Sequence, residues 1–171
     1  MATTYKSLTP GDVVSTRTLL NEAVPVTGTN SGYSGASNAQ NAKKLNIYNQ
    51  MAQVLVGFDE NGSVRQFDKD GDLSGGTKLK ECLFLNFARL LSKDEIKKAS
   101  FTMSFATGGT EAAPDFGNLK TISDYGASTS YKVNSPAGEY GILYTGSQAT
   151  AGTGVGLVYY QAGIAILSSS L

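Results

Sequence analysis

The sequence predicts a mainly β fold: an antiparallel β-sandwich-like domain with one medium helix and one short helix. Apolar residues alternate with polar ones in several stretches, whereas they recur at helical spacing in only one. The chain has 20 glycines and only 16% charged residues, which is typical of a turn-rich β protein rather than a helical bundle. Its 171 residues are enough for a substantial core, so we expect one domain over residues 1–171.

The densest apolar run predicts the centre of this domain. Cys82–Leu91 carries apolar side chains on both faces of a period-two pattern, as in a strand buried on both sides. Ser100–Ala106 alternates strictly between apolar and polar residues and predicts a half-buried antiparallel strand. Between these stretches, Ser92 and Glu95 have capping-box spacing, so the short helix is predicted at Lys93–Ala99.

The first third of the chain predicts one strand and one helix. Val13–Leu20 is rich in Val, Thr and Leu and is interpreted as a strand. Residues 1–12 are polar and residues 28–37 are rich in Gly, Ser and Asn, so we expect both segments to be flexible. Helical spacing predicts the medium helix at Asn38–Val56, through the apolar residues Leu45, Tyr48, Ala52 and Leu55.

The ends of this helix carry recognisable signals. Asn38 and Asn41 are both candidates for the N-cap, and Gly57 stands at the position of a C-cap. The segment Gln53–Phe58 has a second interpretation, because its apolar residues are also compatible with a strand. The following Asn61-Gly62 dipeptide predicts a tight turn.

Asp68–Asp72 is the one stretch that resembles a metal site. An EF-hand calcium loop requires a bidentate Glu at its twelfth position. That position is Leu79 here, and Glu81 is out of step. The stretch is therefore predicted to be an Asp/Gly surface turn without tight calcium binding. The sequence assigns no catalytic, metal-binding or cofactor-binding residue.

The second half of the chain predicts further strands separated by turns. Thr107–Ser123 is expected to be irregular and anchored by Phe116 and Ile122. Asp124–Asn134 is expected to form a hairpin edge through Tyr131 and Val133. Apolar stretches between turns predict three later strands, namely Glu139–Thr145, Val155–Tyr160 and Gly163–Leu167.

The final predicted strand raises a question of pairing. Gly163–Leu167 is apolar, and no later strand follows to cover its edge. An uncovered apolar strand edge promotes aggregation unless another segment pairs with it. We therefore expect Ile164 and Ile166 to face either the core or a partner chain.

Composition argues against several classes of function. The chain contains no histidine, which excludes His-based triads, Cys–His dyads and His-ligated zinc, and we expect that it is not an enzyme. Formal net charge is zero without a basic stripe, so nucleic acid is not an expected partner. No apolar run approaches membrane-spanning length, and the N-terminus lacks a signal-peptide pattern. Cys82 is the single cysteine, which excludes an intramolecular disulfide, and we expect its thiol to be buried and inert.

Five stretches carry a resemblance, namely Val13–Gly28, Asn41–Phe58, Lys80–Ser100, Asn134–Tyr144 and Gly156–Leu167. They resemble a family of virion structural proteins from marine T4-like myophages. Family members known to us carry a longer insertion at Gly28–Ser37 and continue past the position of Leu171, which leaves open where the complete domain ends. The resemblance implies a component of the tailed-phage particle, most often the tail or baseplate. It further implies that the chain is made in the host cytoplasm and binds other virion proteins and itself.

Two other functions remain as alternatives to a structural role. A carbohydrate- or receptor-binding β-module of the phage tail would need an exposed aromatic platform, for which the candidates are Tyr125, Tyr131 and Tyr140. A carboxylate-based hydrolase would need paired acids across a cleft. The only dense acid cluster for this role is Asp59, Glu60, Asp68 and Asp70.

Overall fold

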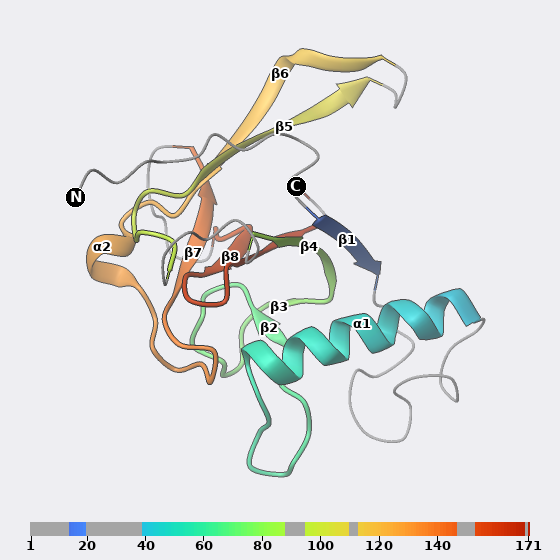
Figure 1. The fold of residues 1–171 in the computed structure, drawn as a ribbon, viewed down its shortest axis with the longest axis vertical. Coiled ribbons are helices and arrows are strands. Elements are labelled where there is room, and N and C mark those ends of the chain that lie inside the picture. Colours follow the sequence, from blue (N-terminus) through green and yellow to red (C-terminus); the bar gives the residue numbers. More distant parts are fainter. Residues whose placement is uncertain (1–13, 20–38, 88–94, 110–112, 147–152, 170) are drawn as a thin grey trace.

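The computed structural model describes residues 14–19, 39–87, 95–109, 113–146, 153–169 and 171. Seven of its strands form one antiparallel sheet in the order β1-β4-β9-β8-β7-β6-β5, and two short strands pair separately (Figure 1). This architecture confirms the predicted mainly β fold with one medium and one short helix. The elements are β1 (Val14–Leu19), α1 (Ala39–Leu55), β2 (Phe67–Asp68), β3 (Lys78–Leu79), β4 (Glu81–Asn86), β5 (Thr102–Gly109), β6 (Pro114–Ser123), α2 (Ala127–Ser130), β7 (Tyr140–Thr145), β8 (Gly156–Tyr159) and β9 (Ile164–Ser168).

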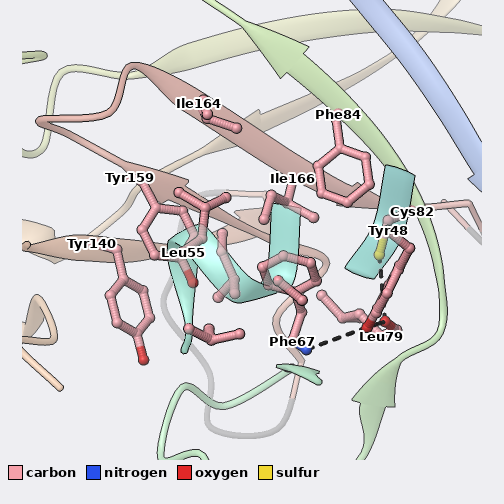
Figure 2. Close-up of a cluster of buried hydrophobic side chains, with 13 residues drawn as sticks. Tyr48, Leu55, Phe67, Leu79, Cys82, Phe84, Tyr140, Tyr159, Ile164 and Ile166 are labelled. Atoms are coloured by element: carbon pink, nitrogen blue, oxygen red, sulfur yellow. Dashed lines mark hydrogen bonds between the residues drawn. The ribbon is translucent and has the colours of Figure 1, made fainter. Parts of the chain in front are cut away.

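The large sheet buries a separate apolar cluster on each of its faces. Successive residues of β4, β8 and β9 belong to opposite clusters, as the pleat of a strand requires; Leu157 and Val158 are one such pair. The first cluster includes residues of α1 and of the β2–β3 hairpin, which pack on that face of the sheet (Figure 2). In the middle of it, the rings of Tyr48 and Phe67 meet edge to face with centroids 5.3 Å apart. The prediction of a strand buried on both sides at Cys82–Leu91 is confirmed for β4, which ends at Asn86; residues 88–91 are outside the described residues.

Helix α1 confirms the medium helix and its C-terminal cap. The chain leaves the helix at Gly57, which has φ 74°, and the Gly57 N–H donates to the Ala52 carbonyl at 3.0 Å. Tyr48, Ala52 and Leu55 are buried as the helical spacing predicts. The alternative interpretation of a strand starting at Gln53 is wrong, because α1 continues to Leu55. Asn41 lies inside the helix, and Asn38, like residues 1–12 and 28–37, is outside the described residues.

The short helix lies elsewhere than the capping-box spacing indicates. Residues 95–99 contain no helix, while residues 93 and 94 are outside the described part of the chain. The backbone of this segment bonds to distant acceptors instead: the Ile96 N–H donates to the Tyr160 carbonyl, and the Ala99 N–H donates to Asp124 Oδ2 at 2.7 Å. Ala99 also has φ 58°, which a helix does not allow. Tertiary hydrogen bonds therefore override the local signal, and the short helix is α2.

Strand β9 is an interior strand, which corrects the expectation of an uncovered edge. It pairs with β4 on one side and with β8 on the other. The edge strands of the described sheet are β1 and β5. Ile164 and Ile166 are buried in the first apolar cluster, so the core and not a partner chain covers them.

The segment from residue 107 to residue 134 also differs from its prediction. Instead of an irregular stretch, Pro114–Ser123 forms β6, which pairs with β5 in a hairpin, here called the β5–β6 arm (residues 102–109 and 113–123). This arm extends away from the rest of the molecule (Figure 1). Ile122 is buried as expected, but Phe116 is exposed and anchors nothing in the described core. The expected hairpin edge at 124–134 is replaced by α2 and a single bridge between Lys132 and Tyr140.

Candidate functional site

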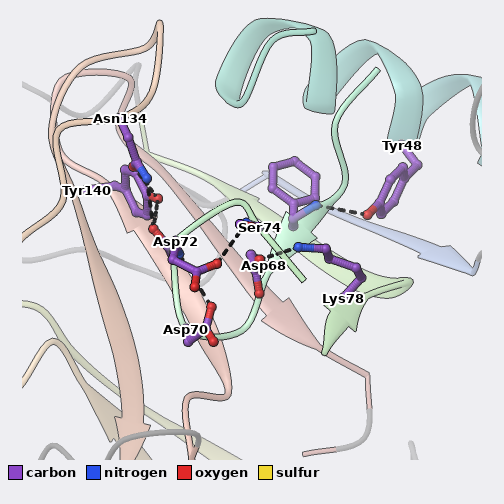
Figure 3. A network of polar contacts seen from close by, with 10 residues as sticks. Tyr48, Asp68, Asp70, Asp72, Ser74, Lys78, Asn134 and Tyr140 are labelled. Atoms are coloured by element: carbon purple, nitrogen blue, oxygen red, sulfur yellow. Dashed lines mark hydrogen bonds and ion pairs between the residues drawn. The ribbon is translucent and has the colours of Figure 1, made fainter. Parts of the chain in front are cut away.

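The loop between β2 and β3 brings three aspartates together. Asp68 ends β2 opposite Lys78 of β3, and the two side chains form an ion pair. Asp70 and Asp72 follow at alternating positions in the loop, and one carboxylate oxygen from each of the three aspartates lies within 4.8 Å of the others. Figure 3 shows the three side chains gathered at this loop. We refer to Asp68, Asp70 and Asp72 as the aspartate cluster.

The loop is bent by glycine and held by its own polar groups. Gly71 has φ 73°, a conformation that favours glycine, and it separates the second and third aspartates. Asp72 Oδ1 accepts the Ser74 N–H at 2.7 Å, and Asp70 Oδ1 lies 3.4 Å from the Asp72 nitrogen. These contacts are typical of Asx turns, as the sequence predicts for this stretch.

The body of the protein anchors the same loop at a buried point. The Gly71 carbonyl accepts the Asn134 amide at 3.0 Å and lies 2.8 Å from the Tyr140 hydroxyl. A Cβ at position 71 would lie only 3.3 Å from the Tyr140 ring, so glycine also allows this close approach. The loop is therefore fixed to β7 rather than hinged only at its two strand ends.

The pKa values of Asp68 and Asp70 are displaced in opposite directions. Burial raises the pKa of Asp68, with Lys78 acting in the opposite direction. Burial also acts to raise the pKa of Asp70, but the Asp72 N–H and the neighbouring Asp68 carboxyl outweigh it, and the pKa is lowered. This opposite displacement is typical of two carboxyl groups that cannot both ionise without cost unless a positive charge lies between them.

The acids named for a hydrolase divide between two places. Asp59 and Glu60 lie on the turn after α1 and line a surface depression of about 660 Å³ together with Asp72. The Asp59 carboxylate accepts the N–H groups of Asn61 and Ser63, at 2.9 and 2.8 Å, and so stabilises its own turn. Asp68 is fully buried beside Lys78 and is absent from the residues that line the depression. The four residues therefore do not line one common depression among the described residues.

The three tyrosines named for a glycan platform do not form one surface. Tyr140 is fully buried and stacks on Tyr159 with ring centroids 4.9 Å apart, which corrects its assignment as an exposed residue. Tyr125 and Tyr131 are exposed on either side of α2. The Lys98 ammonium lies 5.1 Å from the centroid of the Tyr131 ring, so a cation already covers one face of this ring.

The β5–β6 arm exposes large apolar side chains, which the sequence interpretation did not predict. The pairing of its strands shifts between Ala106 and Gly108. Phe116 has 70% and Leu119 has 50% of its surface exposed. Asp115 stabilises the bulge by accepting the Gly117 N–H at 2.8 Å. Single exposed apolar residues are ordinary, whereas contiguous apolar patches mark sites of contact with other proteins.

Cys82 is buried in the first apolar cluster, as predicted. Its thiol lies 3.4 Å from the Leu79 carbonyl oxygen, and burial raises its pKa well above the ordinary range. A thiol that stays protonated is a weak nucleophile. Its lack of reactivity remains a prediction.

Comparison with known proteins identified no relative of this chain. No protein-family model matches the chain, and neither the curated proteins nor the solved structures contain a match. Among the described residues, no helix has the length and apolar character needed to cross a membrane.

Proposed function

We propose that this chain is a structural, non-catalytic component of a tailed-phage particle, in its tail or baseplate. In this role it is made in the host cytoplasm and then binds other virion proteins and further copies of itself. The resemblance of five sequence stretches to virion proteins of marine T4-like myophages supports this proposal. The single structural observation that carries it is the β5–β6 arm, with Phe116 and Leu119 exposed on a hairpin that extends from the body.

The arm has the physical properties of a docking element. Covering Phe116 and Leu119 with a neighbouring subunit would contribute about 2–4 kcal/mol, scaled from about 1.5–3 kcal/mol for a fully buried large apolar side chain. Strand β5 is also an edge of the described sheet, and an edge strand offers backbone donors and acceptors for pairing with a second chain. Contacts of this modest strength become decisive when a symmetric assembly repeats them.

The proposal is tested by locating the chain in purified particles. We expect a particle reconstruction to show copies at symmetry-related positions, with each β5–β6 arm against a neighbouring subunit. Absence of the chain from purified particles would remove the proposal. A reconstruction in which the arm is fully solvated would remove the structural argument for it.

Substitutions on the arm provide a second test with a matched control. Phe116→Ser and Leu119→Ser together remove two side chains that are at least half exposed in the isolated chain, so circular dichroism should show unchanged folding. Val133→Ser is the control, because Val133 is 69% exposed but lies outside the arm. When the double arm variant is the only form of the chain supplied during assembly, we expect it to be absent from the purified particles. The Val133→Ser variant should be incorporated normally. Equal incorporation of both variants would contradict a docking role for the arm.

A further inference from the structure

We propose that the aspartate cluster binds one divalent cation, Ca²⁺, through the carboxylates of Asp68, Asp70 and Asp72. The ion would fix the β2–β3 loop on the body of the protein. This inference does not depend on the virion role. It also differs from the EF-hand arrangement that the sequence argues against, because it requires no ligand at position 79.

The spacing of the oxygens fits one ion. Ca²⁺ binds carboxylate oxygens at 2.3–2.6 Å, so two oxygens on the same ion lie at most about 5 Å apart. The three carboxylates of the cluster each supply an oxygen within 4.8 Å of the others. Ca²⁺ also tolerates irregular shells of 6–8 oxygens, with water at the remaining positions, whereas Mg²⁺ demands a near-ideal octahedron.

A buried oxygen without a partner points to a ligand independently of this spacing. Asp68 is fully buried, and none of the residues that the structure describes donates a hydrogen bond to its Oδ1 atom. Lys78 pairs with the other oxygen, Oδ2. An unsatisfied buried carboxylate oxygen is costly, so native structures place a donor or an ion against it.

The unpartnered oxygen faces a small space that it shares with Asp70. A Cβ built on Gly76 would lie 3.2 Å from Asp68 Oδ1 and also 3.2 Å from Asp70 Oδ2. The two oxygens therefore converge on one space beside the Gly76 Cα, which a larger residue would fill. Gly76 has φ 63°, which favours glycine, and it places no Cβ against the two oxygens.

The charges of the site leave room for a divalent ion. The three carboxylates together carry −3 when ionised, and the Lys78 ammonium compensates only one of these charges. The remaining −2 is the charge that Ca²⁺ balances. Because Tyr140 and Asn134 already hold Gly71 in place, the loop needs little ordering to bind the ion.

Calorimetry on the whole chain, stripped with a chelator and dialysed at pH 7, tests the proposal. We expect CaCl₂ to bind with a stoichiometry near one and to raise the melting temperature. Asp70→Asn should weaken binding about tenfold or more, because affinity follows the number of charged ligands. Without calcium, the same variant should melt slightly below the wild-type temperature, because the ionised Asp70 carboxylate, whose pKa is lowered in the folded chain, favours folding. Asp115→Asn is the matched control, since Asp115 also accepts the N–H of the second residue after it but lies on the arm.

A spectroscopic measurement locates the ion. The chain has nine tyrosines and no tryptophan, so emission of Tb³⁺, a calcium substitute, is sensitised through tyrosine alone. Tyr140→Phe should reduce this emission more than Tyr125→Phe, because the Tyr140 hydroxyl contacts the Gly71 carbonyl in the loop. Absence of calcium heat and of any melting shift in the wild-type chain would overturn the proposal. Equal calcium affinity of the wild type and Asp70→Asn would also overturn it, by placing the ion elsewhere.

Discussion

The first apolar cluster contains one buried tyrosine whose hydroxyl group has hydrogen-bond partners and one whose hydroxyl group has none among the described residues. Tyr48 and Tyr159 are both fully buried in this cluster (Figure 2). The Tyr48 hydroxyl donates to the Leu79 carbonyl at 2.6 Å and accepts the Phe67 N–H at 3.3 Å. The Tyr159 hydroxyl has no hydrogen-bond partner among the described residues. Tyr→Phe at each position removes the same atom and leaves the ring, so the difference between the variants reports hydrogen bonding.

The structure gives opposite signs for the two substitutions. A hydrogen bond contributes about 0.5–1.5 kcal/mol net, and a buried group left without its partner costs about 1–3 kcal/mol. In Tyr48→Phe the Leu79 carbonyl oxygen keeps one hydrogen-bond partner, because the Cys82 thiol also lies 3.4 Å from it. We therefore expect Tyr48→Phe to lower the free energy of unfolding by about 2 kcal/mol. Tyr159→Phe removes an unsatisfied hydroxyl and should raise the free energy of unfolding by about 1 kcal/mol.

Urea denaturation followed by circular dichroism measures both variants against the wild type. For a chain of this size, a loss of about 2 kcal/mol also corresponds to a fall of about 4–8 °C in melting temperature. The slope of the denaturation curve should stay constant, since neither variant changes the buried surface much. Equal losses in the two variants would refute the reasoning, because the effect would then not depend on whether the hydroxyl group has a hydrogen-bond partner.

Three further predictions concern buried groups elsewhere. Asp124→Asn should cost about 1.5–3 kcal/mol, because the carboxylate accepts the Tyr160 hydroxyl and two backbone N–H groups. Burial raises the pKa of Asp124 above its ordinary 3.8, so the folded state retains a proton that the unfolded state releases. The stability that this proton contributes is therefore lost as the pH rises above about 3.8. Chemical denaturation at several pH values should show that the free energy of unfolding falls less steeply with pH in Asp124→Asn than in the wild type. Gly156→Ala should cost about 1–3 kcal/mol in the same assay, because a Cβ there would lie 2.2 Å from the Ile166 carbonyl oxygen of the paired strand; an unchanged midpoint would contradict this. Cys82 should react with a thiol reagent only as fast as the chain unfolds, and rapid labelling of the native protein would contradict its burial.

The periodicity of side chains determined most of the elements of the central sheet. Period-two alternation predicted β4 and β5, because the two faces of a strand are set by the covalent pleat of the backbone. Apolar stretches between turns predicted β7, β8 and β9. Helical spacing predicted α1, and Gly57 marked its end, because few other residues adopt the left-handed conformation found there. These features depend on neighbours a few residues apart, so the sequence contains them directly.

Tertiary contacts decided the features that carry the proposals. Most residues of β6 are not buried on either face, so the sequence of β6 shows no alternation of apolar and polar residues that would have predicted its pairing with β5. Residues 95–99 follow hydrogen bonds to distant strands and not their local capping signal. The three aspartates converge because positive-φ glycines bend their loop and because Tyr140, 69 residues away from Gly71, holds it against the sheet. No local pattern specifies a contact at that separation; it arises when burial of the apolar clusters brings β7 and the β2–β3 loop together.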